Sequence, residues 1–158
     1  MNKAFFPSIV FVCAMILFAC NSSNNESATA SRLVGEWNNI SIKVDIQSAN
    51  NSDSNSVFDA KRGEWEPVVK IRPIRTFFNA DSTWHSAHYT LKDSLFYDPS
   101  GRWWIEGDSL VMQQQLPAPE TTKYFLTLNG DTASFRGILD WDTDKKRDDI
   151  YFGEQIRK

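Results

Sequence analysis

Cysteine is almost absent from this chain, which has two, Cys13 and Cys20, among 158 residues. The first 19 residues have the composition of a removable leader, so the mature chain would retain Cys20 alone. A single cysteine cannot form an intrachain disulfide. Stability must therefore come from a packed core, for which the aromatic content of 13% supplies ample apolar surface.

A large excess of charge is also lacking. The formal net charge is −3, and loss of Lys3 with the leader would make it −4. Proteins that bind nucleic acid or anionic membrane faces carry strongly basic surfaces. The charge balance therefore gives no reason to expect nucleic acid or an acidic lipid surface as a partner.

The residue groups that usually carry catalysis are missing as well. The two histidines, His85 and His88, are three positions apart on a predicted strand, so they point to opposite faces and cannot chelate one metal ion together. No nucleophile is paired with a base, and no two carboxylates are marked as a general acid and base. We therefore expect a protein that is not an enzyme and needs no cofactor.

The N-terminal segment resembles the signal peptide of a bacterial lipoprotein. Ala4 to Ala19 is almost wholly apolar but short for a membrane-spanning helix, and it leads into Leu17-Phe18-Ala19-Cys20, which is similar to the lipobox. The resemblance implies that residues 1–19 are removed and that Cys20 carries acyl chains, such as palmitate, which hold the protein on a bilayer. An ordinary cleaved secretory signal and an uncleaved anchor are the alternatives.

A polar segment follows the predicted lipid anchor. Asn21 to Ala30 contains asparagine, serine and alanine with one acid, Glu26, and no apolar residue large enough to anchor it. We interpret residues 20–30 as the lipidated cysteine and a flexible tether that holds the protein off the membrane. Residues 31–158 then form one domain.

From Trp37 onward the pattern is that of antiparallel strands. Between Ile40 and Ile46 apolar residues alternate with polar ones, as in a strand with one buried face. Trp37 has the opposite parity, which predicts a β-bulge at Asn38-Asn39 or a different neighbour for the tryptophan. Seven further strands are predicted, over 68–78, 83–91, 102–106, 109–114, 123–128, 132–140 and 149–157.

The connections between these strands are short. Turns such as Gly107-Asp108 and Asn129-Gly130-Asp131 imply that neighbours in sequence pair, and no segment has a convincing helical pattern. An open meander of this length would leave two free edges, and closing it removes them. We therefore predict an all-β fold, a single eight-stranded antiparallel up-and-down β-barrel, with a two-sheet β-sandwich as the alternative.

One long insertion interrupts the strands. Residues 47–64 are rich in asparagine, serine and aspartate up to Ser56, with Val57-Phe58 as the one apolar foothold. A loop of this length in a compact domain is usually functional or disordered. Val57-Phe58 could pack this segment over the barrel as a lid.

The head of the first strand resembles a known family. Gly35-Glu36-Trp37 is similar to the Gly-x-Trp signature of the lipocalin (calycin) superfamily, and with the lipid anchor it looks like the lipocalin-like lipoproteins of bacterial envelopes, notably those of the Bacteroidetes. The resemblance covers about residues 31–158. It implies that Arg157 stacks over Trp37 where the first and last strands meet, with Leu33 plugging that end. We expect a monomer anchored in the cell envelope, at the outer membrane.

Aromatic side chains are the candidate ligand contacts. They could line a pocket for an apolar ligand, or they could fill the barrel solid, which is the simpler interpretation. Adjacent Trp103 and Trp104 must face opposite ways. The pocket candidates are Trp37, Phe58, Phe78, Trp84 and Phe135.

A run of aspartates near the C-terminus resembles a calcium loop. Carboxylates at alternate positions can converge on a hard cation. The glycine that such a loop needs for its sharp turn is replaced by Lys145, and two basic residues follow, so a solvated hairpin tip is the better interpretation. The weak calcium candidates are Asp140, Asp142, Asp144 and Asp148.

The sequence leaves two functions open. One is a carrier that binds a small, largely apolar ligand in the barrel, with the 47–64 segment as a lid. The other is a filled-barrel scaffold that binds another envelope protein. An internal void reached from the long insertion would favour the first, and an exposed apolar patch around Val57-Phe58 and one of Trp103 and Trp104 would favour the second.

Overall fold

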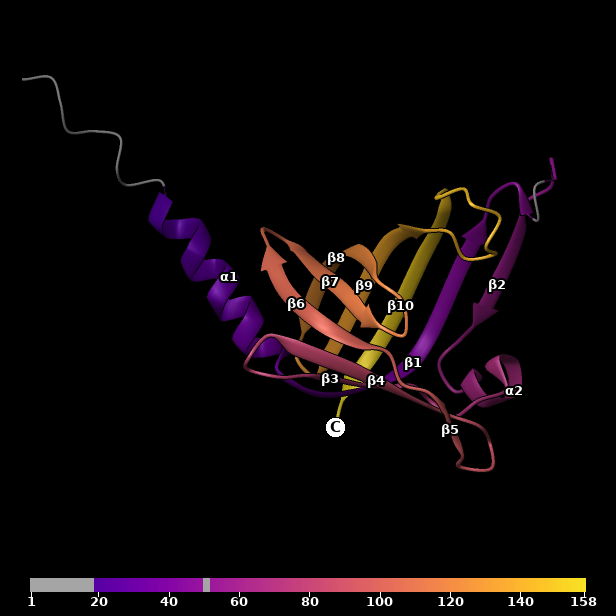
Figure 1. Cartoon of the computed structure of the whole chain (residues 1–158), viewed down its shortest axis with the longest axis horizontal. Helices are drawn as coiled ribbons and strands as arrows, with labels where there is room; N and C mark the ends of the chain where they lie inside the picture. Colours follow the sequence, from indigo (N-terminus) through magenta and orange to yellow (C-terminus); the bar gives the residue numbers. More distant parts are fainter. Residues whose placement is uncertain (1–18, 50–51) are drawn as a thin grey trace, which may run out of the picture.

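The first and last strands of the chain pair with each other and close the sheet into a barrel. The computed structural model describes residues 19–49 and 52–158. β1 (Gly35–Ile46) pairs with β10 (Asp149–Arg157) along most of its length, and Figure 1 shows the two side by side. The other strands of the barrel are β3 (Arg75–Phe78), β4 (Thr83–Tyr89), β6 (Ser100–Glu106), β7 (Ser109–Leu116), β8 (Glu120–Asn129) and β9 (Thr132–Leu139).

The strand order around the barrel follows the sequence. It runs β1-β3-β4-β6-β7-β8-β9-β10 and returns to β1, with every pair antiparallel. The short turns predicted at Gly107-Asp108 and Gly130-Asp131 each join two neighbouring strands. The prediction of a closed, eight-stranded antiparallel barrel is confirmed, and the alternative of a two-sheet sandwich is not what the chain forms.

Two short strands and a helix extend the barrel beyond the predicted pattern. β2 (Ser56–Ala60) pairs with the end of β1, while β3 pairs with its beginning. β5 (Leu95–Tyr97) pairs with β4, and α2 (Trp65–Val69) connects β2 with β3. The predicted insertion at 47–64 therefore contains one arm of a hairpin and is not one long loop.

The predicted strand at 68–78 is confined to β3. Its first two residues belong to α2, so the expectation of a chain without helices is wrong here. Buried Trp65 anchors α2, and its Nε1 donates a hydrogen bond to Arg72 O at 3.2 Å. The helix ends at Val69, and the next residue, Lys70, has a left-handed φ of 65°. Burial of one tryptophan stabilises this short helix, and the local sequence pattern does not reveal that tertiary contact.

A second helix precedes the barrel, where the sequence predicts a flexible tether. α1 (Ala19–Leu33) projects from one end of the barrel in Figure 1. Glu26 Oε1 accepts a hydrogen bond from Gly107 N at 2.8 Å, and Arg32 Nη2 donates to Leu128 O at 3.0 Å. Contacts with two separate β-hairpins therefore hold the helix in place, and composition alone could not indicate them.

β1 contains a bulge, the first of the two alternatives that the parity of its residues predicts, but one residue beyond the expected Asn38-Asn39. Its pairing with β10 shifts between Asn39 and Ser41, which leaves Ile40 as the extra residue. Buried residues lie at odd positions before the shift and at even positions after it, so Trp37 and Val44 both face the interior.

Arg157 and Trp37 meet where the barrel closes. The two residues are directly paired on β10 and β1, and Arg157 Cζ lies 4.3 Å from the centroid of the Trp37 ring. Arg157 also donates hydrogen bonds to Val34 O, at 2.8 Å, and to Arg32 O, while Trp37 Nε1 donates to Leu33 O at 2.7 Å. The guanidinium thus ties the end of α1 and the start of β1 to the last strand.

Gly35 provides the space for this contact. Its φ of +135° is a conformation that other residues rarely adopt, and a Cβ at this position would lie 2.6 Å from Arg157 Nη1. Gly35 therefore leaves room for the Arg157 side chain, and Trp37 provides the ring on which the guanidinium stacks.

The largest buried cluster surrounds this closed end. Trp103 is 3% exposed and faces into the cluster, whereas Trp104 is 42% exposed and faces outward, as the alternation of a strand requires. The main members of the cluster are Leu33, Trp37, Phe78, Trp84, Trp103, Ile105, Leu110, Leu126, Ala133 and Phe135.

The closed end should dominate stability. We expect Trp37→Ala to lower the free energy of unfolding by about 3–5 kcal/mol, because it removes a fully buried indole. Arg157→Ala should lower it by about 1–2 kcal/mol through the lost stacking, and the exposed control Trp104→Ala by about 0.5 kcal/mol. Urea unfolding followed by circular dichroism measures all three. A Trp37→Ala protein as stable as the Trp104→Ala control would contradict the role of this junction.

Candidate functional site

The barrel contains a cavity, partly open to solvent, beyond the plug formed by Trp37 and its neighbours. Its volume is about 300 Å³, within the range of small-molecule sites. Side chains from β1, β3, β4, β5, β7, β8, β9 and β10 line it, so the wall needs most of the barrel. None of the described residues that line it is a lysine, arginine, aspartate or glutamate. The barrel is therefore filled at one end and hollow further along.

The structure divides the predicted pocket residues into two groups. Phe78, Trp84 and Phe135 line the cavity, and they also belong to the cluster that closes its base. Trp37 lies fully buried within the plug and is not part of the cavity wall. Phe58 packs instead against Trp141, with ring centroids 5.9 Å apart. The cavity wall thus combines three predicted aromatic residues with others that the sequence analysis did not single out.

Two tyrosines were missed, and each lies beside a glycine in a strand. A Cβ at Gly137 would lie 2.9 Å from Tyr124 Cδ1, and one at Gly153 would collide with the Tyr151 hydroxyl. The two rings are 5.6 Å apart inside the barrel and both line the cavity. A glycine within a strand often marks the close approach of another group, so Gly137 and Gly153 were the available signal.

Burial keeps these tyrosines neutral. It raises the pKa of the Tyr151 phenol to about 12, and it raises the pKa of Tyr124 as well. The charged form of a phenol is disfavoured where water is excluded. Both hydroxyl groups therefore remain protonated at neutral pH, and neither acts as a base there.

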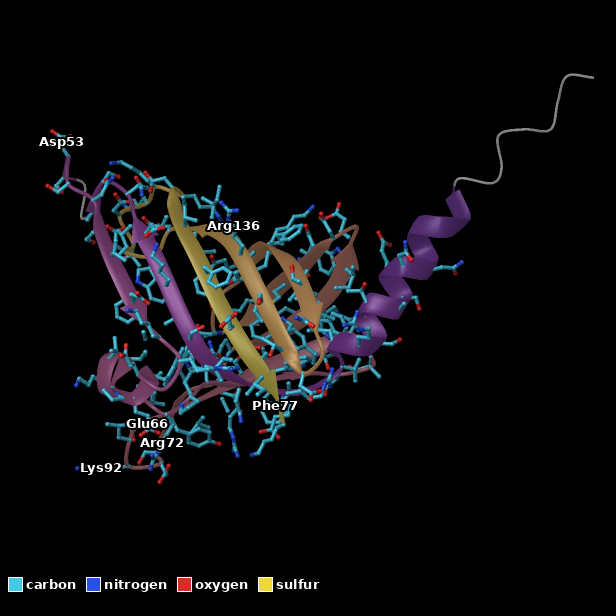
Figure 2. The ribbon with its side chains drawn as sticks, turned by 180° about the vertical axis from the view of Figure 1, so that it is seen from behind. Asp53, Glu66, Arg72, Phe77, Lys92 and Arg136 are labelled. Atoms are coloured by element: carbon cyan, nitrogen blue, oxygen red, sulfur yellow. The ribbon has the colours of Figure 1, made fainter. Side chains whose placement is uncertain are left out.

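His88 is the one histidine in the cavity wall. Its ring meets those of Phe96 and Tyr97 edge-on, with centroids 6.1 and 5.0 Å away. Burial lowers the pKa of His88, and the nearby Asp98 carboxylate offsets this only in part. His85 points out of the barrel and stacks on Phe77, with centroids 4.4 Å apart (Figure 2 labels Phe77). The two histidines therefore lie on opposite faces, as the sequence predicts.

A row of uncharged polar groups crosses the cavity wall. Gln155 Nε2 donates hydrogen bonds to Asn39 Oδ1 at 3.0 Å and to Thr76 Oγ1 at 3.3 Å. The hydroxyl groups of Thr76 and Ser86 are hydrogen-bonded to each other, with their oxygens 3.0 Å apart. These four residues come from β10, β1, β3 and β4, which are consecutive in the barrel. This part of the cavity wall is therefore polar without being charged.

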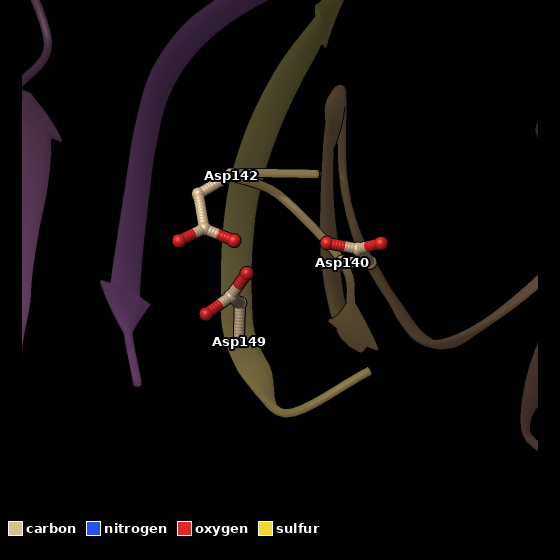
Figure 3. A group of neighbouring side chains, drawn as sticks. All are labelled: Asp140, Asp142 and Asp149. Carbon is tan, nitrogen blue, oxygen red and sulfur yellow. The ribbon is translucent and has the colours of Figure 1, made fainter. Parts of the chain in front are cut away.

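The aspartate cluster forms around a residue that was not among the candidates. Figure 3 shows Asp140, Asp142 and Asp149, whose carboxylate oxygens lie within 4.8 Å of one another. The predicted set paired Asp140 and Asp142 with Asp144 and Asp148 instead. Asp149 is the first residue of the last strand, as predicted. The sequence pattern does not indicate that its side chain is fully buried. Three carboxylates in this arrangement could take a hard cation.

These carboxylates also hold the backbone of their own loop. Asp149 Oδ2 accepts a hydrogen bond from Trp141 N at 2.6 Å, and its Oδ1 accepts one from Gln47 N at 2.9 Å. Asp140 Oδ2 accepts from Lys145 N at 3.0 Å. This pattern fits the preferred interpretation as a hairpin tip. Since Trp141 lines the cavity, Asp149 connects the tip to the cavity wall.

The 47–64 segment supports the cavity wall from outside. None of its described residues lines the cavity. Phe58 on β2 contacts Trp141, whose ring also lies 6.2 Å from that of Tyr151. Gln47 is held by Asp149, as described above. The contacts therefore place this segment behind Trp141, and they do not form the lid over the barrel that its composition suggested.

Comparison with protein families and with curated proteins found no match. Within the part of the chain that the structure describes, neither helix combines the length and apolar character needed to cross a membrane. The class of the protein is therefore defined by its fold and cavity: a closed, eight-stranded antiparallel β-barrel with a small uncharged interior site.

Asp149 should be important for the ordering of the cavity rim. We expect Asp149→Asn to lower the free energy of unfolding by about 2–3 kcal/mol, because an amide offers one acceptor where two backbone N–H groups now bind a carboxylate. Asp59→Asn, on the exposed side of β2, is the matched control and should change stability by about 0.5 kcal/mol. Chemical denaturation measures both. Equal losses in the two variants would contradict a positioning role for Asp149.

Proposed function

We propose that this protein is a non-catalytic lipocalin-like lipoprotein of the bacterial envelope that binds a small, largely apolar molecule inside its barrel. The observation that carries the proposal is the uncharged cavity of about 300 Å³ with aromatic residues in its wall. Pockets of this size and character are the usual form of small-molecule sites in proteins. The barrel provides a rigid wall, because every lining strand except β5 is hydrogen-bonded on both sides.

The chemistry of the lining supports binding over catalysis. The described residues of the wall include one imidazole, three phenols and no carboxylate. Proton transfer in an active site needs a group whose pKa lies near the working pH and a second group to orient it. The raised pKa of Tyr151 and the lowered pKa of His88 favour the neutral forms of both side chains, and the described residues of the wall offer no carboxylate to orient the imidazole. We therefore assign the cavity a binding role.

The envelope assignment rests on the N-terminal sequence. The leader at 1–18 and the side chain of Cys20 lie outside the described residues, so the lipobox resemblance carries this part of the proposal. α1 has 15 residues, and a helix of that length spans about 20 Å at 1.5 Å per residue. An acylated Cys20 near the start of α1 would place the membrane at the end of the helix that is farthest from Leu33.

A second candidate function is the docking of another envelope protein on the outside of the barrel. Phe125, Ile138, Ile150 and Phe152 are exposed on the outer faces of β8, β9 and β10. Ile138 and Ile150 are cross-strand partners, and the two phenylalanines flank Arg136, which Figure 2 labels on this surface. Neighbouring apolar side chains of this kind support an interaction surface.

The exposed apolar patch that the sequence analysis named as evidence for docking is not one continuous surface. Val57 and Trp104 are both exposed, but they lie on β2 and β6. Three strands separate β2 from β6 in the sheet. The cavity therefore remains the stronger basis for a function, and docking on the β8–β10 surface is the alternative if the cavity binds nothing.

A neutral apolar dye tests the binding function. We expect N-phenyl-1-naphthylamine to fluoresce on binding the wild-type protein, and Met112→Trp to weaken that binding by at least about tenfold, because it fills the cavity. Gln113→Trp is the matched control, since the next residue on β7 faces outward and should leave affinity unchanged. Dye binding that is equal in the two variants would place the dye on the surface, and absence of binding to wild type would contradict the proposal.

A second experiment tests the anchor. We expect Cys20→Ala to move the protein from the membrane fraction to the soluble fraction of the producing cells, because acyl chains supply the membrane affinity. Cys13→Ala should leave the protein in the membrane fraction, since the lipobox resemblance ends at Cys20. Intact-mass measurement of the mature protein identifies the acyl groups. Membrane retention of Cys20→Ala would indicate an uncleaved anchor instead.

A further inference from the structure

The cavity wall contains one buried acceptor that the protein leaves without a donor. Gln155 is 9% exposed and lines the cavity from β10. Its Oε1 is buried, and no donor among the described residues reaches it. Buried polar atoms in native proteins are almost always hydrogen-bonded, so an exception in a binding cavity indicates a missing partner.

The orientation of this amide is fixed by its neighbours. Both Nε2 hydrogens of Gln155 are used, one by Asn39 Oδ1 and one by Thr76 Oγ1. If the amide turned over, its oxygen would face the side-chain oxygen of Asn39, so the hydrogen bond to Asn39 Oδ1 sets this orientation. Thr76 is held in turn by Ser86, whose hydroxyl lies 3.0 Å away. The polar row is complete except at Gln155 Oε1.

The surroundings also limit the charge that a ligand can carry. The described residues of the cavity wall include no cation that could pair with a carboxylate or phosphate and no anion that could pair with an amine. A charge that is buried without a partner is strongly disfavoured. His88 does not change this, because its burial favours the neutral imidazole.

We propose that the barrel binds an uncharged amphiphile whose hydroxyl or amide group donates a hydrogen bond to Gln155 Oε1, while its apolar part packs on Phe78, Trp84 and Phe135. This inference rests on the proposed binding function and names the class of ligand. A hydroxyl or amide N–H supplies the donor that the wall lacks. An ether or ester supplies acceptors alone and leaves Gln155 Oε1 unpaired, and a carboxylate brings an unpaired charge as well.

Three small probes of similar size test the proposal on the wild-type protein. Octan-1-ol, its isomer 1-methoxyheptane and octanoate compete with N-phenyl-1-naphthylamine at neutral pH. We expect the alcohol to bind about tenfold more tightly than the ether, the effect of one added buried hydrogen bond. Octanoate should bind more weakly than either, because its charge has no partner in the cavity.

Variants test whether Gln155 causes the difference in affinity between the alcohol and the ether. In Gln155→Met, which keeps the volume and removes the amide, the advantage of the alcohol over the ether should fall to within about twofold. Gln113→Met, on the outward face of β7, is the matched control and should retain the full tenfold advantage. If Gln155→Met does not fold, the three probes on the wild-type protein still decide the question.

Each contrary outcome has its own meaning. Equal binding of the alcohol and the ether to the wild-type protein would overturn the inference about the donor and leave the proposed binding function standing. Octanoate that binds as tightly as the alcohol would overturn the requirement for an uncharged ligand. If none of the three displaces a dye that Met112→Trp excludes, the inference fails and the proposed binding function stands. If the wild-type protein binds no dye, the binding function itself fails, and the inference fails with it.

Discussion

The stacking of Arg157 on Trp37 is the contact on which the rest of the structure depends. It lies where β1 and β10 pair, and this pairing turns an eight-stranded meander into a closed barrel. The same guanidinium binds the backbone at the end of α1, so the helix, the first strand and the last strand share one anchor. Without closure, two strand edges would be free and the interior would have no continuous wall.

The plug at this end allows the other part of the barrel to be hollow. Bulky side chains such as Trp37 and Trp103 supply the buried apolar surface that stabilises the domain. Further along, Gly137 and Gly153 admit the rings of Tyr124 and Tyr151, and a polar row replaces the apolar packing. The packed core and the hollow part thus occupy different levels of one barrel, which explains how the domain tolerates a cavity.

The rim of the cavity depends on residues that are far apart in the sequence. Asp149 binds the backbone of Gln47 and of Trp141, and Phe58 packs on Trp141 from β2. The segment that composition suggested as a lid is therefore part of the support for one wall residue. The aspartates that resembled a calcium loop mainly hold the backbone of their own turn, with Asp149 as the member that the pattern did not include.

The sequence by itself determined the eight strands of the barrel, their order and the closing motif, but not β2 or β5. Alternation of apolar and polar residues and short glycine turns are local signals, and the parity of Trp37 also predicted the bulge in β1. The tertiary structure alone decided that Asn21 to Ala30 is helical, that Trp65 anchors a turn of helix, and that Trp37 and Phe58 stay out of the cavity wall. These features depend on contacts between distant segments, and Gln155 shows the same limit, because a buried acceptor without a donor can be recognised only when its neighbours are in place.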